Sequence, residues 1–136
     1  MSPFSPPAGV RTTRTRQGPP VLALTGEFDH ATLGRPALAL TELLGEAADV
    51  LVLDLTDVTF GSAGMVTMLL AARAHATERG TDFRVVTGRN RIVERLLDLT
   101  ASRPALDTYP DLATALDAMS SARFVELAER MWTSAA

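Results

Sequence analysis

Cysteine is absent from this chain, and histidine is scarce, with two residues among 136. Without cysteine there is no disulfide, no thiol nucleophile and no cysteine-held metal, and the composition suits a reducing compartment such as the cytoplasm. The two histidines, His30 and His75, are too few for a histidine-based metal cluster. We therefore expect neither a metal nor a cofactor in this protein.

An excess of basic residues is also missing, because 13 Lys and Arg stand against 16 Asp and Glu, for a net charge of −3. This balance argues against general nucleic-acid binding. No apolar run reaches the ~20 residues that span a bilayer, and the N-terminus lacks the basic start and apolar core of a secretory signal. Arg11, Arg14 and Arg16 fit a solvated edge strand better than a basic binding patch. We expect a cytoplasmic protein without membrane contact.

The sequence is organised around one stretch, residues 50–79. Its first part, Val50 to Leu55, is nearly continuously apolar and rich in branched side chains, which is typical of a strand buried on both faces. A short loop is expected at residues 56–61. From Ser62 to about Arg79 apolar residues recur at helical spacing, and Gly80 is a natural helix stop.

Short strands and helices alternate along the rest of the chain. Expected strands lie at residues 10–17, 21–25, 83–86 and 105–109, and expected helices at about 29–47, 90–99, 110–119 and 121–133. The first two strands predict an antiparallel hairpin, and Asp29 or Thr32 is the expected cap of the first helix, with Pro36 in its first turn. The ordering predicts an α/β fold with a mixed sheet of four to five strands, four helices and an extra C-terminal helix.

These elements predict one domain with two appendages. Residues 1–9 hold three of the eight prolines and are expected to form a loosely ordered tail. Residues 10–119 are the expected domain, and residues 120–136 the helical extension. Phe124, Leu127, Ala128 and Met131 share one face of that extension. We expect this face to cover part of the sheet or of the helix layer, with a dimer contact as the alternative.

Ser62 stands where the central helix begins, and a serine there has two possible roles. Its hydroxyl can cap the helix by accepting a hydrogen bond from a first-turn amide, a contribution of about 1 kcal/mol. Alternatively, it is a reactive hydroxyl exposed to solvent on a loop, in the positive field of the helix N-terminus. Spacing alone favours the cap.

No pattern of known catalytic chemistry is present. The sequence has no phosphate-binding loop, no dinucleotide fingerprint and no nucleophile elbow. His75, in mid-helix, has no evident nucleophile partner, so a surface or hydrogen-bonded histidine is the preferred interpretation. Asp54, at the end of the buried strand, is more simply explained by hydrogen bonds to nearby loop amides than by catalysis. We expect no enzyme, although a small enzyme or ligand carrier stays open as an alternative.

Three segments resemble the STAS domain, and within it the small stand-alone anti-sigma-factor antagonists of bacteria. L-T-G-E-F-D-H-A-T, residues 24–32, is similar to the family's L-x-G-E-L-D motif, and V-L-D-L-T-D-V-T-F-G-S-A-G-M, residues 52–65, to its strand, loop and D-S-[SA]-G-L segment. Residues 84–100 are similar to the fourth strand and the following helix. The likeness covers roughly residues 10–119.

The resemblance implies a regulatory module of transcription rather than a catalyst. In that family the serine of D-S-[SA]-G is phosphorylated by a partner that is both anti-sigma factor and serine kinase, and a metal-dependent serine/threonine phosphatase restores it. The matching residue is Ser62, which makes it the expected phosphoacceptor. The expected partner-binding residues surround it: Thr25, Gly26, Asp29, His30, Phe60, Gly61, Ala63, Gly64 and Met65.

One departure from the family pattern keeps a second interpretation open. The family usually has two residues between the phenylalanine-like position and the serine, the second an aspartate that helps to shape the loop and the kinase contact. Here Gly61 alone lies between Phe60 and Ser62. The alternative is therefore a partner-binding scaffold that has lost the switch, and Thr59 is a poorer second candidate for an acceptor.

Overall fold

In the computed structural model, five strands form one mixed sheet in the order β1-β2-β3-β4-β5. The structure describes residues 8–14, 18–46, 48–119 and 121–134, so residues 1–7 of the expected tail lie outside it. The elements are β1 (Gly9–Thr13), β2 (Val21–Phe28), α1 (Gly34–Leu44), β3 (Val50–Gly61), α2 (Ala63–Glu78), β4 (Asp82–Val86), α3 (Arg91–Leu99), the short 3₁₀ helix η1 (Arg103–Ala105), β5 (Asp107–Tyr109), α4 (Leu112–Asp117) and α5 (Ser121–Ser134).

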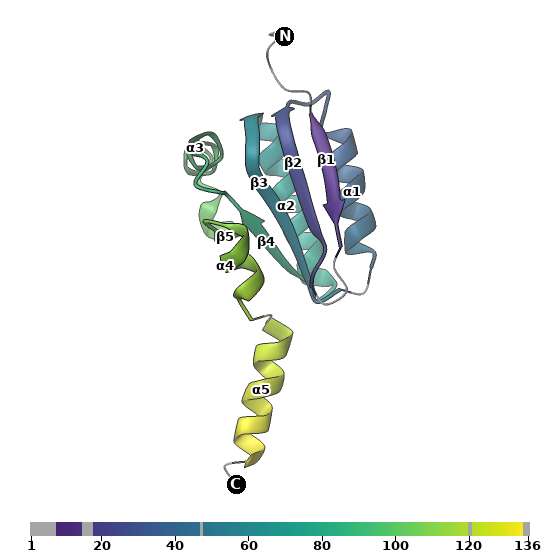
Figure 1. Cartoon of the computed structure of the whole chain (residues 1–136), viewed down its shortest axis with the longest axis vertical. Helices are drawn as coiled ribbons and strands as arrows, with labels where there is room; N and C mark the ends of the chain where they lie inside the picture. Colours follow the sequence, from purple (N-terminus) through teal and green to yellow (C-terminus); the bar gives the residue numbers. More distant parts are fainter. Residues whose placement is uncertain (1–7, 15–17, 47, 120, 135–136) are drawn as a thin grey trace.

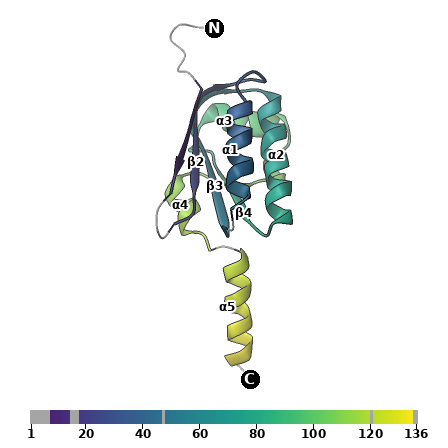
Figure 2. The same cartoon turned by 90° about the vertical axis from the view of Figure 1, so that its right-hand side faces the viewer.

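The opening hairpin and the parallel crossovers are confirmed. Strand β1 is antiparallel to β2, while β2, β3, β4 and β5 run parallel to one another. Figure 2 shows α1 and α2 side by side on one face of the sheet, with α4 on the other. Because parallel strands need a crossover between them, the crossover helices α1 and α2 lie on a face of the sheet and bury apolar side chains there.

The main core fills the space between the sheet and helices α1, α2 and α3. Its largest fully buried side chains are Phe28, Phe83, Leu22, Leu24, Leu44, Leu51, Leu53, Leu55, Met65, Leu69 and Leu97. A second, smaller cluster of Val52, Val86 and Ala115 lies on the opposite face, under α4. The near-continuous apolar run of β3 is thus explained, because both of its faces are covered.

Strand β3 is twice as long as predicted. The expected loop at residues 56–61 is wrong, because these residues continue the strand and pair with β2 through Phe28 and Gly61. Likewise β2 runs on past Gly26, which has a φ of 91° and lies between two register shifts. A glycine at positive φ is therefore a bulge inside the strand and not the break that its type predicts.

Strand β4 accompanies only the first part of β3. Their pairing begins at Val50 with Asp82 and ends at Asp54 with Val86. From Leu55 onward β3 has β2 as its neighbouring strand on one side only. The C-terminal half of β3 therefore extends beyond the central part of the sheet and carries Ser62 at its end.

The first helix begins later than predicted. Leu33, without a side-chain hydrogen bond, is its N-cap, and neither Asp29 nor Thr32 caps it. Pro36 does lie in the first turn, where its missing amide costs nothing. The helix ends at Leu44, and Gly45 is its C-cap, so the expected end at Ala47 is three residues too far.

The C-terminal elements lie at the end of the sheet where β2 and β3 begin. Arg84, only 2% exposed, holds α4 on the sheet, because its Nη1 donates to Ala115 O at 2.7 Å and its guanidinium lies 5.8 Å from the Tyr109 ring centroid. Helix α5 then leaves the domain and points away from it (Figure 1). The expected covering role of α5 is wrong, since its large apolar side chains are exposed.

Candidate functional site at the start of helix α2

Ser62 occupies the N-cap position of α2, as its sequence position predicts. Its backbone is extended, with φ −81° and ψ 169°. The Ser62 amide donates to Phe28 O at 2.9 Å, and the Ser62 carbonyl accepts from Met65 N at 3.0 Å. The end of β2 therefore fixes the point at which β3 turns into α2.

The hydroxyl of Ser62 matches neither of its two predicted roles. It makes no capping hydrogen bond, so the cap is confirmed in position only. Its Oγ is buried and has no hydrogen-bond partner among the described residues, so the expected exposure to solvent is wrong for this side-chain conformation. A buried hydroxyl without a partner costs about 1 to 3 kcal/mol, and such groups are rare enough to need an explanation.

Gly61 is the residue where the family pattern would place an aspartate, and the structure gives a steric reason for its absence. A Cβ added to Gly61 would lie 2.6 Å from Met65 Sδ and 3.0 Å from Leu96 Cδ2. Met65 is 1% exposed and belongs to the main core. The backbone at Gly61 therefore passes so close to α2 and α3 that a side chain there requires the core to move.

Asn90 holds the overhanging half of β3 in place. Its Nδ2 donates to three backbone oxygens of β3, Leu55 O at 3.3 Å, Thr56 O at 3.0 Å and Val58 O at 2.7 Å. Its Oδ1 accepts from Ile92 N at 3.0 Å and so caps α3. One side chain thus replaces the missing strand partner and ties β3 to the start of α3. The cap could be predicted from sequence, whereas the contact across 32 to 35 residues has no local signal.

Asp54 has the structural role predicted for it. Its Oδ1 accepts from Thr56 N at 3.0 Å and from the Thr56 hydroxyl. Thr56 in turn packs against Gly88, whose φ of 65° suits glycine and whose lack of Cβ leaves room for the threonine. The contacts of Asp54 and Thr56 therefore stabilise strand β3 near the point where Asn90 binds it.

The turn between β2 and α1 lies beside Ser62. Asp29 Oδ1 accepts from Ala31 N at 2.9 Å and from Thr32 N at 3.2 Å, while the Thr32 hydroxyl accepts from Asp29 N at 3.0 Å. A Cβ on Gly64 would lie 3.1 Å from Leu33 Cδ1 and 3.5 Å from Ser62 Oγ. The Asp29 side chain therefore stabilises this turn through hydrogen bonds to residues within the turn.

The predicted partner-binding residues divide by exposure. Asp29, His30, Ala63 and Gly64 are exposed, and Phe60 is 49% exposed, which is unusual for a phenylalanine. Thr25 and Gly61 are half-buried. Gly26 and Met65 are buried, so a partner can reach neither the backbone of Gly26 nor the side chain of Met65 in this conformation. The accessible members form a small surface at the C-terminal end of β3 with one aromatic side chain.

His75 lies in a groove between α1 and α2, far along α2 from Ser62. The groove is otherwise lined by apolar and small side chains and by two threonines, and His75 is the one titratable residue of its described lining. No group of three or more His, Cys, Asp or Glu suited to a metal ion occurs among the described residues. Within the same part of the chain, no helix is long and apolar enough to cross a membrane.

Comparison with known proteins identifies the relatives of this fold. A family model described as "Mlab, STAS domain" matches residues 12–102. An anti-sigma factor antagonist from Mycobacterium paratuberculosis has 27% sequence identity and a TM-score of 0.68, over 79% of this chain and 91% of that one. A comparison with curated protein sequences finds no match.

Two further solved structures agree in fold alone. The anti-sigma factor antagonist SpoIIAA in its unphosphorylated form has 12% identity and a TM-score of 0.62, over 74% of this chain and 88% of that one. A STAS domain protein from Planctomyces limnophilus has 17% identity and a TM-score of 0.64, over 78% and 93%. The family match covers well over half of the sequence, from the opening hairpin to the end of α3. The chain therefore belongs to the STAS domain family.

Proposed function

We propose that this protein is an anti-sigma-factor antagonist, a cytoplasmic regulatory module that binds an anti-sigma factor with serine kinase activity and is switched by phosphorylation of Ser62. A serine/threonine phosphatase would reverse the switch. The observation that carries the proposal is Ser62 itself, at the start of a 16-residue helix, whose hydroxyl forms no hydrogen bond with any residue that the structure describes. The protein would act by binding and carry no catalytic group of its own.

The relatives support this assignment. One similar structure is an anti-sigma factor antagonist at 27% identity, and another is an antagonist in its unphosphorylated form, which connects that protein with phosphorylation. The segment matched by the family model contains both Ser62 and the turn beside it. Because one fold can serve many functions, the switch still needs a direct test.

A kinase could reach the hydroxyl by rotation of one bond. Serine Oγ occupies one of three staggered positions about χ1, and Ala63 and Gly64, which follow Ser62, are both exposed and small. In the proposed mechanism, χ1 rotation moves Oγ from its buried position toward this open side. No hydrogen bond opposes that motion, because the hydroxyl has no partner in the observed position.

Phosphorylation would alter binding more than folding. It adds about −1.5 to −2 charge units and three acceptor oxygens, and the first turn of α2 holds no acidic residue that would repel them. Helix N-termini tolerate phosphate well, through their free amides and the helix dipole. A partner surface that packs closely on the methyl group of Ala63 and the backbone of Gly64 would not accommodate the same group.

The test uses the full chain and the purified anti-sigma factor kinase of the same organism, with ATP and Mg²⁺. Intact-mass analysis should show the gain of one phosphate in the wild type and in Thr59→Ala, and none in Ser62→Ala. Partner binding by calorimetry should persist in Ser62→Ala and weaken at least tenfold in Ser62→Asp. A mass gain that persists in Ser62→Ala would refute the assigned acceptor.

The crowding at Gly61 favours one alternative, a STAS scaffold that binds a partner without being phosphorylated. In the family the preceding aspartate helps the kinase contact, and here a side chain at this position would meet Met65 and Leu96. Binding of the anti-sigma factor with no phosphate gain under any condition would favour the scaffold. Equal affinity of Ser62→Asp and the wild type for the anti-sigma factor would also favour the scaffold.

A further inference from the structure

Helix α5 carries a continuous apolar stripe that the described part of the domain leaves largely exposed. The stripe consists of Phe124, Leu127, Ala128 and Met131, at the spacing of one helix face, with Val125 and Trp132 along one edge. Phe124 is 64% exposed, Met131 71% and Trp132 81%. Soluble monomers rarely leave such a group of large side chains in water without a use for it.

The helix has little to hold it together by itself. Isolated helices shorter than about 12 to 15 residues are marginal in water, and α5 has 14. The exposed pair on its polar face, Arg130 Nη2 to Glu126 Oε1 at 2.8 Å, is worth only a few tenths of a kcal/mol. Burial of the stripe is therefore what a stable α5 requires.

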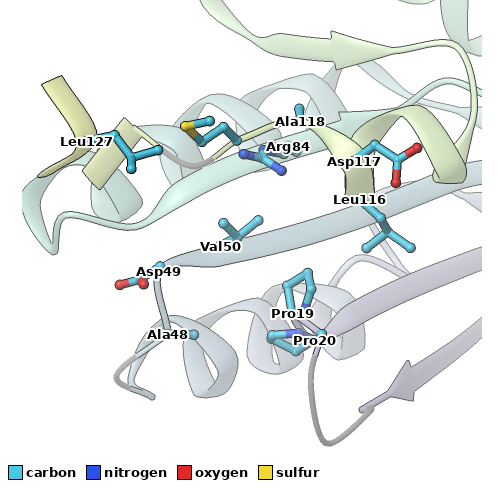
Figure 3. A pocket seen from close by; sticks show the side chains of 12 residues that line it. Pro19, Pro20, Ala48, Asp49, Val50, Arg84, Leu116, Asp117, Ala118 and Leu127 are labelled. Atoms are coloured by element: carbon cyan, nitrogen blue, oxygen red, sulfur yellow. The ribbon is translucent and has the colours of Figure 1, made fainter. Parts of the chain in front are cut away.

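The stripe continues into a hollow at the root of the helix. Met119 and Leu127 line both the apolar surface of α5 and a hollow of about 570 Å³ on the α4 face of the sheet. Figure 3 shows Leu127 at one end of this hollow, with Leu116, Pro19 and Pro20 farther along it and Val50 on its floor. This hollow, which Asp49, Arg84 and Asp117 also line, thus connects the apolar surface of α5 with the start of β2 and β3.

We propose that the stripe is a dimer interface, covered in solution by α5 of a second copy of this chain. Large side chains have surfaces of roughly 150 to 250 Å² each, so the exposed fractions of the stripe and its edge amount to about 500 to 600 Å². A two-fold pair buries this area twice, about 1,000 to 1,200 Å², which is the lower limit for a specific interface. The dimer is therefore expected to be weak and concentration-dependent.

The order of residues along the stripe suits a two-fold antiparallel pair. With the axis between Leu127 and Ala128, Phe124 of one copy lies opposite Met131 of the other, and Leu127 opposite Ala128. Both pairings are complementary, because methionine sulfur contacts an aromatic ring favourably and a small residue opposite leucine lets the helices approach. The stripe carries no charge, so no oppositely charged partner is required.

The antiparallel arrangement also avoids a clash between domains. Each domain is much broader than the helix and lies at its N-terminal end (Figures 1 and 2). Parallel helices would force two domains into the same space, whereas antiparallel helices place them at opposite ends of the pair. Such an isologous contact closes on itself and does not lead to a filament.

Sedimentation velocity over a concentration series from low micromolar to several hundred micromolar tests the dimer. The wild type should change from monomer to dimer, and Met131→Glu should weaken association at least tenfold. The matched control is Thr133→Glu, which adds the same charge on the polar face of the same helix and should leave association unchanged. Wild type that stays monomeric at all concentrations would overturn the proposal, as would equal association of Met131→Glu and Thr133→Glu.

Trp132 offers a second readout, because it is the single tryptophan of the chain. Its emission should shift to shorter wavelength as concentration rises, in parallel with the mass, and should stay at long wavelength in Met131→Glu. A short-wavelength emission in a monomer at every dilution would show that α5 folds back on its own domain, and would refute the second copy as its cover. Both measurements are independent of phosphorylation, so their failure leaves the proposed switch untouched.

Discussion

At the residue scale, Ser62 combines a predictable position with an unpredictable environment. Sequence pattern predicts the start of the helix to the residue, because a serine precedes an apolar run with helical spacing. Its amide donates to Phe28 O of strand β2, and its Oγ lies 3.5 Å from where a Cβ on Gly64 would be. Neither contact can be read from the local pattern. Local pattern therefore predicts where a site residue is and not what surrounds it.

The unpaired hydroxyl makes Ser62→Ala informative about stability. Replacement of a capping serine costs about 1 kcal/mol, whereas removal of a buried hydroxyl without a partner removes a desolvation penalty. We expect the free energy of unfolding of Ser62→Ala to equal or exceed that of the wild type in urea denaturation. Asp111→Ala is the control, because Asp111 is a true cap with Oδ1 2.8 Å from Thr114 N. A comparable loss in both variants would mean that Ser62 caps α2 in solution.

Gly61 should tolerate no side chain without cost. We expect Gly61→Ala to lower the free energy of unfolding by about 1 to 2 kcal/mol, because the new methyl group overpacks the contact with Met65 and Leu96. The control is Gly34→Ala in α1, where a Cβ meets nothing within 4 Å and reduced chain entropy should stabilise by up to about 1 kcal/mol. Thermal melts of both variants test the difference, and equal stability of the two would contradict the crowding.

At the scale of elements, strand β3 shows which part of an element the sequence pattern predicts and which part it misses. Val50–Leu55 has the composition of a buried strand and is one. Residues 57–60 alternate polar and apolar side chains, a strand signal too short to be distinguished locally from a loop. In the structure they pair with β2, which continues past the irregularity at Gly26. The alternation of helices and strands, by contrast, is visible locally and predicts the fold class.

Asn90 should be needed for the overhanging half of β3. Asn90→Asp keeps the acceptor for Ile92 N and replaces the donor to three carbonyls by an acceptor that repels them. We expect a loss of about 2 kcal/mol and faster hydrogen exchange in residues 55–62. Asp111→Asn is the matched control, since that cap only accepts a hydrogen bond. Unchanged exchange in Asn90→Asp would show that β2 alone holds the strand.

The stability of helix α4 should depend on pH through its N-cap residue, Asp111. The backbone hydrogen bond from Thr114 lowers the pKa of Asp111 below its usual 3.8, assisted by the side chain of Thr114 and by Arg89. The ionised cap therefore stabilises α4 fully above that pKa, and the contribution disappears as the pH falls through the lower, folded value. We expect the melting temperatures of wild type and Asp111→Asn to differ at neutral pH and to converge near pH 2. A difference that does not change with pH would exclude this charge effect.

At the scale of the molecule, the family match ends at residue 102 and α5 lies beyond it. We propose that residues 10–119 fold as the domain and that residues 120–136 are a separable extension. Removal of residues 120–136 should change the free energy of unfolding by less than about 0.5 kcal/mol and abolish dimer formation. Urea denaturation and sedimentation of the shortened chain measure both. A large loss of stability would show that α5 packs on the domain.

The two ends of β3 lie near different functional features. Ser62 follows its last residue, whereas the root of α5 lies near its first, about 35 Å away at 3.3 Å per residue. A pair of chains joined through α5 would thus keep the two Ser62 sites far apart, so that each could bind a partner at the same time. Two partner molecules held on one surface or in one complex would then be bridged, and the second contact would form at high effective concentration. A weakly dimerising helix would in this way convert a modest affinity at each site into strong retention wherever copies of the proposed partner are clustered.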